Sequence, residues 1–243
     1  MIETAMVLAA GFGKRMRPLT DTIPKPLVKI AGKPLIGYAF DRLREAGVSR
    51  AVVNGHYLAG QIEAWGAAQV SPRVLFSDER DDILETGGGI VRALPLLGEQ
   101  PFYVMNADCF WLDGEVPALQ RLSGMWDEAR MDCLLLLCDP ARTTGYDGAG
   151  DFAIGADGRL TRAKSHAYIG GYIVHPRFFA DAPQGPFSTN VLWNRAIAQG
   201  RLFGLAHDGW WLHVGTVPAI AEAEAKMKEY QRQSSYRRKP GSR

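Results

Sequence analysis

Short apolar segments alternate with amphipathic segments through the first 140 residues of the chain. Five short apolar segments have the length and composition of buried strands: residues 5–10, 50–54, 74–77, 102–106 and 132–138. Apolar positions at helical spacing predict helices over residues 34–46, 88–94 and 116–126. Strands separated by helices predict a mostly parallel sheet flanked by helices. The run from Cys133 to Cys138 is the most hydrophobic segment, so we expect it at the centre of the sheet.

The pattern changes after residue 140. Five glycines punctuate residues 145–158, which predicts hairpins, and Asp157-Gly158 is a favourable turn pair. Further strands are predicted at residues 168–174, 201–206 and 210–214, and further helices at 189–199 and 217–230. We expect one domain over residues 1–230, with two halves that meet near residue 140. Residues 231–243 are predicted to form a disordered basic tail, because no aliphatic residue occurs after Arg232.

Composition places the chain among ordinary globular proteins. It has 243 residues, of which 47% are hydrophobic, and 28 Lys and Arg against 26 Asp and Glu, a formal net charge of +2. This near balance argues against a dedicated nucleic-acid binder. The charge is unevenly placed, because the first 33 residues contain six basic and two acidic side chains. We therefore expect a local basic site.

Three features favour a cytoplasmic protein. Glu3 stands where a signal peptide would carry positive charge. The longest apolar run, from Cys133 to Cys138, is far shorter than the roughly 20 residues that span a bilayer, so no membrane segment is predicted. The three cysteines form no CxxC pair, which argues against a disulfide framework or a zinc site.

The first predicted strand runs directly into Gly11-Phe-Gly13-Lys14-Arg15-Met-Arg17. Glycines let backbone N–H groups approach phosphate oxygens, and Lys and Arg neutralise them, so the loop favours a polyphosphate ligand. Met16 rules out the GxGxxG dinucleotide motif, and no Gly-Lys-Ser/Thr sequence of a P-loop is present here. On its own, the loop is equally compatible with an ordinary strand-to-helix turn.

A second motif, Pro24-Lys25-Pro26-Leu27, holds one lysine between two prolines. Taken alone it could be a rigid surface turn. With the segment Leu8 to Thr20 and with Gly32-Lys-Pro-Leu-Ile36, it strongly resembles the sugar-phosphate nucleotidyltransferases, or NDP-sugar pyrophosphorylases, and the likeness runs from Met6 to about Lys228. The resemblance implies a Rossmann-like, GT-A-like fold with a mixed, mostly parallel sheet and no β-helix domain.

The resemblance also implies the reaction and its central residues. Members of this family join an NTP to a sugar-1-phosphate, which attacks the α-phosphorus and releases pyrophosphate. Arg15 is then expected to grip the triphosphate and Lys25 to contact phosphate at the reacting centre. Nucleotide contacts are expected from Leu8, Ala10, Gly11, Gly13, Lys14 and Arg15. Positioning and charge neutralisation supply most of such catalysis, so no protein nucleophile is needed.

Two further segments match family sites. The resemblance implies that Glu85, Thr86, Gly87 and Gly88 contact the nucleobase, although the glycine cluster could instead be a flexible loop. Asp108 follows a predicted strand and corresponds to the family's metal-binding carboxylate, so we expect it to bind Mg²⁺. A helix cap or Asx turn is the alternative for Asp108.

The second metal position departs from the family pattern. Many members read Asp-Val-Gly-Thr, whereas this chain reads His213-Val-Gly-Thr216. Imidazole suits Mg²⁺ poorly. His213 could lie beside a one-carboxylate Mg²⁺ site, could itself bind a different metal, or could mark a weakened catalyst. We favour the first interpretation.

Recognition of the sugar is expected mainly from the second half of the chain. The resemblance implies contacts to the sugar phosphate from Lys25, Asn106, Gly171 and Asn190. A bulge at Gly170-Gly171 and a helix cap at residues 188–190 are the alternatives.

Within the family the chain is most similar to the N-acetylmuramate-1-phosphate uridylyltransferases of a peptidoglycan-recycling route. This similarity implies UTP and N-acetylmuramate 1-phosphate as substrates. A mannose-1-phosphate guanylyltransferase, another hexose-1-phosphate nucleotidyltransferase, or a catalytically silent nucleotide-sugar-binding paralogue are the alternatives. We expect a monomer or a small homo-oligomer.

Overall fold

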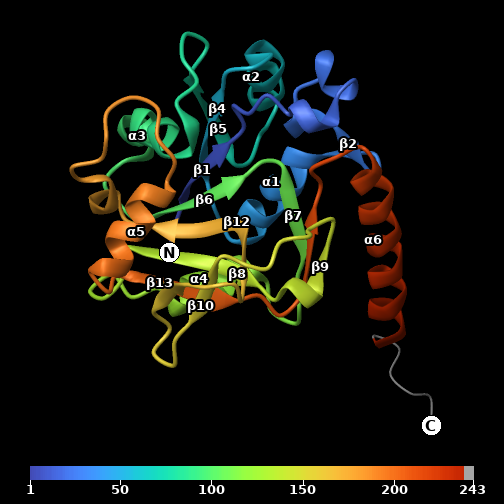
Figure 1. Ribbon diagram of the computed structural model, residues 1–243. Coiled ribbons are helices and arrows are strands. Elements are labelled where there is room, and N and C mark those ends of the chain that lie inside the picture. Colours follow the sequence, from blue (N-terminus) through green and yellow to red (C-terminus); the bar gives the residue numbers. More distant parts are fainter. Residues whose placement is uncertain (238–243) are drawn as a thin grey trace.

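A computed structural model describes residues 1–237 and shows a seven-stranded sheet between helical layers (Figure 1). The strand order is β13-β8-β12-β6-β1-β4-β5. Only β12 runs antiparallel to its neighbours, which confirms the mixed, mostly parallel sheet. The strands are β1 (Thr4–Leu8), β4 (Arg50–Gly55), β5 (Arg73–Asp78), β6 (Phe102–Asn106), β8 (Cys133–Cys138), β12 (Ala167–Val174) and β13 (Leu202–Ala206).

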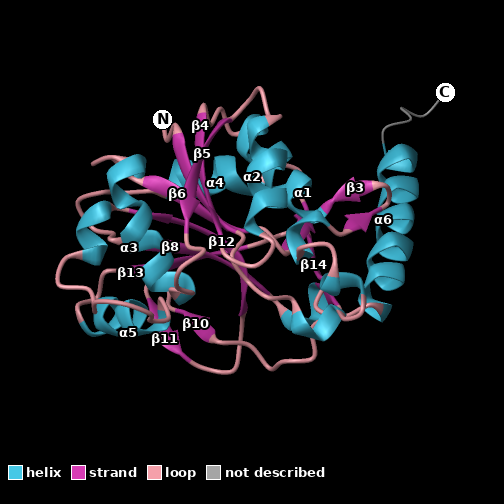
Figure 2. Cartoon of the chain, turned by 90° about the horizontal axis from the view of Figure 1, so that it is seen from above, coloured by secondary structure: helices cyan, strands magenta, loops and turns pink. Residues whose placement is uncertain are grey.

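Helices cover both faces of the sheet, as Figure 2 shows for α1 and α2 on one side and α3 and α5 on the other. A hydrophobic core lies on each face of the sheet, because successive side chains of β1 point to opposite faces. Ala5 and Val7 pack with α1, α2 and α4, while Met6 packs with α3 and α5. The helices are α1 (Leu35–Glu45), α2 (Ala59–Ala67), α3 (Glu85–Leu97), α4 (Ala118–Met125), α5 (Asn190–Ala198) and α6 (Pro218–Arg237). None of the helices within residues 1–237 is long and apolar enough to cross a membrane.

The structure corrects three sequence predictions. Strand β8 is buried at every position but lies second from the edge, since hydrophobicity reports burial on both faces and not position in the sheet. Helix α2 was not predicted, because Gly60 and Gly66 weaken its helical pattern. Helix α6 continues to Arg237, seven residues beyond its predicted end, and the rest of the predicted tail lies outside the described residues. The division into two halves stays a prediction.

A smaller sheet joins the second half of the chain to the first. Its strands are β7 (Cys109–Leu112), β14 (Trp210–His213) and β9 (Thr143–Thr144), and α6 packs beside them at one side of the molecule (Figure 1). Strand β14 pairs antiparallel with β7 so that His213 lies opposite Cys109. This register brings His213 close to Asp108, although more than 100 residues separate them in sequence.

The remaining elements are short. The hairpin predicted around Asp157-Gly158 is confirmed by the pairing of β10 with β11. The short strands are β2 (Lys29–Ile30), β3 (Lys33–Pro34), β10 (Phe152–Ile154) and β11 (Leu160–Arg162). The 3-10 helices are η1 (Lys14–Met16), η2 (Leu19–Asp21), η3 (Lys25–Leu27), η4 (Pro140–Arg142) and η5 (Pro176–Phe179).

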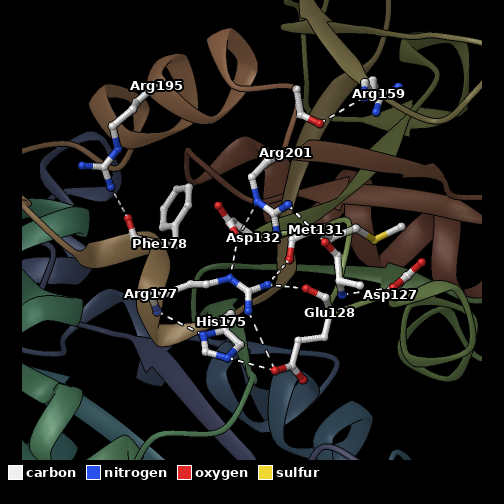
Figure 3. Close-up of polar contacts among 12 residues, drawn as sticks. Asp127, Glu128, Met131, Asp132, Arg159, His175, Arg177, Phe178, Arg195 and Arg201 are labelled. Atoms are coloured by element: carbon white, nitrogen blue, oxygen red, sulfur yellow. Dashed lines mark hydrogen bonds and ion pairs between the residues drawn. The ribbon is translucent and has the colours of Figure 1, made fainter.

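A buried carboxylate ties three strand ends together at the edge of the sheet opposite the loop after β1. Asp132 precedes β8, Arg177 follows β12 and Arg201 precedes β13. Oδ1 of Asp132 accepts hydrogen bonds from Nε of Arg177 at 2.6 Å and lies 2.9 Å from Nε of Arg201 (Figure 3). We call these three residues the Asp132 clasp.

Breaking this clasp should destabilise the protein without changing its active site. Asp132→Ala leaves two guanidinium groups without their shared carboxylate, and we expect it to lower the free energy of unfolding by about 2–4 kcal/mol. Urea denaturation followed by circular dichroism measures this loss. A loss below about 0.5 kcal/mol, the range of ordinary surface substitutions, would show that the clasp is not stabilising.

Candidate active site

The loop after β1 forms one wall of a pocket of about 500 Å³ at the C-terminal edge of the sheet. Gly13 has a left-handed φ of 63°, and a Cβ there would lie 2.9 Å from Cβ of Lys25. Only glycine therefore lets this loop pack against Lys25. The hydroxyl of Thr20 donates a hydrogen bond of 2.9 Å to the Gly13 carbonyl and holds the loop. The predicted nucleotide contacts that line this pocket are Leu8, Ala10, Gly11, Gly13, Lys14 and Arg15.

Lys25 and Asp108 meet in the same pocket. Lys25 begins η3 and is only 7% exposed, while 39% of the Asp108 side chain is exposed. Nζ of Lys25 donates to Oδ2 of Asp108 at 2.9 Å. Burial by itself would raise the pKa of Asp108, but the charge of Lys25 and its hydrogen bond hold that pKa below its ordinary value. Asp108 is therefore an anion at neutral pH and is accessible to a ligand.

A second pocket of about 650 Å³ shares Arg15, Asn106, Asp108 and Gly215 with the first. The rest of its wall contains three aromatic side chains, Tyr146, Tyr168 and Trp211, together with acidic side chains such as Asp147 and Glu222. The two pockets can thus hold two ligands that meet beside Arg15 and Asp108.

His213 lies in the second pocket, with its ring centroid 5.2 Å from that of Trp211 and 6.4 Å from that of Tyr146. Burial lowers the pKa of His213, and the charges of Lys25 and Arg15 lower it further, against the opposing effect of Asp108. The imidazole is therefore neutral at pH 7. Its Nδ1 is buried and has no hydrogen-bond partner among the described residues.

The arrangement limits how a metal ion could be held. Within residues 1–237, no three His, Cys, Asp or Glu side chains are grouped closely enough to bind one. Mg²⁺ usually keeps several waters and binds one or two carboxylates together with substrate phosphates. The accessible carboxylate of Asp108 fits a Mg²⁺ site of this type, in which substrate phosphates and water complete the coordination.

The predicted base-binding segment forms the first turn of α3 and not a loop. Glu85 and Thr86 line the first pocket, but Gly87 and Gly88 do not. A Cβ on Gly87 would overlap the Phe187 ring, and one on Gly88 would lie 2.5 Å from the Gly185 carbonyl oxygen. The N–H groups of Gly87 and Gly88 donate to the Phe187 carbonyl at 2.8 and 3.3 Å. These glycines therefore allow α3 to pack against residues 185–187.

Gly87→Ala should destabilise the protein by about 1–3 kcal/mol, because the new methyl group must displace a buried ring. Gly60→Ala is the matched control, since Gly60 also lies in a helix but has open space where its Cβ would be. We expect that control to stabilise the protein by about 0.5–1 kcal/mol through helix propensity. Urea denaturation of both variants tests the difference, and equal effects would contradict the packing role of Gly87.

Two predicted sugar contacts lie away from the second pocket. Gly171 faces the Trp111 ring, which a Cβ would approach to 3.0 Å, and Gly170 lines the pocket instead. The register shift between Tyr168 and Tyr172 identifies the glycine pair as a bulge. Asn190 accepts a hydrogen bond of 2.8 Å from Arg162 on the protein surface. Asn106, by contrast, lies where both pockets meet.

Three further residues line the pockets and were not predicted: Asn54, Tyr146 and Asp147. Asn54 lies near the C-terminal end of β4, and its position at the end of a predicted parallel strand was a usable signal. No periodicity marks Tyr146 and Asp147, which follow Gly145. The positive φ of 76° at Gly145 lets the chain pass close to the His213 carbonyl oxygen.

Comparison with known proteins gives matches over most of the chain. Residues 5–146 match the family described as the MobA-like NTP transferase domain. The N-acetylmuramate alpha-1-phosphate uridylyltransferase of Caulobacter vibrioides is 46% identical over 237 residues, which cover 93% of this chain and 98% of that protein. The protein of the same name from Neisseria meningitidis serogroup B is 38% identical over 228 residues, with coverages of 91% and 96%.

A solved structure, UDP-glucose pyrophosphorylase complexed with UDP-glucose, shares the fold with a TM-score of 0.78 at 20% identity, covering 95% of this chain and 100% of that chain. The chain therefore belongs to the MobA-like NTP transferase family. More narrowly, it is an enzyme of the sugar-phosphate nucleotidyltransferase class, and the resemblance seen in the motifs around Arg15 and Lys25 is confirmed.

Proposed function

We propose that the protein transfers UMP from UTP to N-acetylmuramate 1-phosphate, which yields UDP-N-acetylmuramate and pyrophosphate. The observation that carries this proposal is the meeting of two pockets at Arg15 and Asp108, one beneath a glycine-rich basic loop and one lined in part by Tyr146, Tyr168 and Trp211. The choice of UTP and of this sugar rests on the two curated uridylyltransferases that match nearly the whole chain.

In the proposed reaction, a phosphate oxygen of the sugar-1-phosphate attacks the α-phosphorus of UTP. A new P–O bond forms to the sugar phosphate, the bond from the α-phosphorus to the bridging oxygen breaks, and pyrophosphate leaves with that electron pair. Lys14 and Arg15 neutralise the phosphates of UTP, and Lys25 donates a hydrogen bond where charge develops on the α-phosphate oxygens. The enzyme contributes positioning and charge, and no side chain becomes covalently attached.

Base recognition is assigned to the start of α3. Glu85 has a φ of 57°, unusual for a residue with a side chain, and it lines the first pocket beside Thr86. This backbone turn can present peptide groups to the edge of the uracil ring. On the sugar side, Asn106, Tyr146 and Tyr168 are the proposed contacts.

The family generally uses a divalent metal, and we propose that Asp108 binds Mg²⁺ here. A bound Mg²⁺ would withdraw charge from the reacting phosphate. Asp108 would be the protein carboxylate that holds the ion, and neutral His213 would not be one of its ligands. Lys25 keeps Asp108 ionised for this role.

A matrix of nucleotides and sugar phosphates tests the function. The protein is incubated with Mg²⁺, with each of ATP, CTP, GTP, UTP and dTTP, and with N-acetylmuramate, N-acetylglucosamine, glucose or mannose 1-phosphate, and pyrophosphate release is measured. We expect the highest kcat/KM for UTP with N-acetylmuramate 1-phosphate. A higher value for GTP with mannose 1-phosphate would support the guanylyltransferase alternative, and no pyrophosphate from any pair would support a silent paralogue.

A further inference from the structure

Glu79 is a buried carboxyl group behind the nucleotide pocket that the proposed reaction does not use. It follows β5, has no exposed surface, and forms no ion pair with any described residue. One of its oxygens, Oε2, has no hydrogen-bond partner within the part of the chain that the structure describes. Burying such a group is costly, so its presence in this position calls for a function.

A chain of two hydrogen bonds connects Glu79 to the glycine-rich loop. Oε1 of Glu79 accepts a hydrogen bond of 2.7 Å from Nδ2 of Asn54. Oδ1 of Asn54 in turn accepts one of 2.7 Å from the backbone N–H of Ala9. Asn54 and Ala9 both line the nucleotide pocket, but Glu79 does not. Glu79 thus fixes which end of the Asn54 amide faces the loop.

The same pair of side chains touches the start of α3. A Cβ on Gly89 would lie 2.8 Å from Oε1 of Glu79 and 2.9 Å from Nδ2 of Asn54. The third glycine of the cluster therefore makes room for this hydrogen bond. Because the first turn of α3 also carries Glu85 and Thr86, the pair lies between the two backbone segments that face the nucleotide.

The backbone of Glu79 is held as firmly as its side chain. Its N–H donates to the Gly55 carbonyl at 2.9 Å, and its carbonyl oxygen lies 2.6 Å from Nδ1 of His56. Burial raises the pKa of Glu79, while the Asn54 hydrogen bond, the Leu84 backbone N–H and the charges of Arg92 and His56 oppose the rise. An oxygen that accepts from Asn54, and not a negative charge, is what the geometry requires.

We propose that Glu79 is a positioning residue for the nucleotide. By accepting a hydrogen bond from Asn54, it orients that amide toward Ala9 and sets the spacing between the glycine-rich loop and the start of α3. Its effect is on NTP affinity and not on the chemical step. The inference rests on the proposed function only in the use of UTP as the nucleotide.

The test compares Glu79→Met, which removes the acceptor at similar size, with Glu79→Gln, whose amide oxygen can still accept. UTP dissociation constants are measured by titration calorimetry without any sugar phosphate. We expect Glu79→Met to raise the Kd for UTP by about tenfold, with kcat at saturation changed by less than about threefold and an unchanged KM for the sugar phosphate. Glu79→Gln should stay within about twofold of the unmodified protein.

Asp132→Ala is the matched control, because it removes a buried carboxylate at the opposite edge of the sheet and should leave the Kd for UTP unchanged. Asn54→Leu keeps the test available if Glu79→Met does not fold. Asn54→Leu should bind UTP more weakly than the unmodified protein. If Glu79 acts through Asn54, the double variant Asn54→Leu/Glu79→Met should bind UTP as Asn54→Leu does and no more weakly.

Two results would overturn the inference: folded Glu79→Met with the UTP affinity of the unmodified protein, or Glu79→Gln as weak as Glu79→Met. Either result leaves the proposed reaction standing if the unmodified protein forms UDP-N-acetylmuramate. Conversely, if the unmodified protein forms no product but binds UTP, the proposed function fails while the role of Glu79 is still measured. If UTP does not bind to the unmodified protein, the Kd measurements on the Glu79 variants use the nucleotide of the matrix that binds best.

Discussion

Asp108→Asn is expected to lower kcat by at least about 10², because the amide cannot supply the charge that holds a divalent metal at the reacting phosphate. The asparagine has nearly the same shape and can still accept a hydrogen bond from Lys25, so the fold should be unchanged. Steady-state pyrophosphate release at saturating substrates measures the effect, and circular dichroism checks the fold.

The matched control is Asp157→Asn, which changes the same group in an exposed hairpin turn, where Asp157 pairs with Arg159. We expect this control to keep kcat within about twofold. Near-normal turnover of Asp108→Asn would mean that the metal is held by other residues, and the assignment of Asp108 would then be wrong.

Lys25→Met is the second change with a large expected effect. Lys25 is almost fully buried against Asp108, so its ammonium is held in place before substrates bind. Removing a preorganised donor of this kind typically costs about 10² to 10³ in kcat. Lys29→Met is the control, because it removes the same charge from an exposed lysine four residues after Lys25. Stopped-assay pyrophosphate measurements on both variants give the ratio.

The same substitution should also change the pH dependence. Lys25 lowers the pKa of Asp108, so without it the burial of Asp108 acts unopposed by that charge and the pKa rises. The acidic limb of the kcat/KM profile should therefore move to higher pH in Lys25→Met. A limb that stays in place would mean that Asp108 is not the group whose protonation inactivates the enzyme.

Part of the nucleotide site could be predicted because its residues belong to short motifs near the start of the chain or stand at strand ends. The glycine-rich loop and Lys25 are part of local motifs, and Asp108 stands directly after a strand. A parallel sheet brings such strand ends to one edge, which predicts that the loop and Asp108 lie near each other, while Lys25 was indicated by the family resemblance. Here the structure assembles the pocket that the motifs indicate.

The sugar side was less predictable. Gly171 and Asn190 have the residue types of a binding site, yet one faces Trp111 and the other binds Arg162 on the surface. Whether a residue of β12 or α5 reaches the pocket depends on a bulge and on helix packing, and neither follows from local sequence alone. Tyr146 and Asp147 lie in an irregular loop that carries no periodic signal.

The sequence by itself determined the main-sheet strands and the helices α1, α3 and α4 of the first 140 residues, but not α2 or β7, and it determined the basic loop after the first strand. Its resemblance to the sugar-phosphate nucleotidyltransferases indicated Lys25 and Asp108. The predicted strands and helices follow from local backbone preferences and from the alternation of buried and exposed positions. Only the tertiary structure decided that His213 lies near Asp108, that Glu79 supports Asn54, and that the glycines of α3 serve packing. Each of these contacts joins segments distant in the chain, and its geometry depends on strand order and register, which local patterns do not encode.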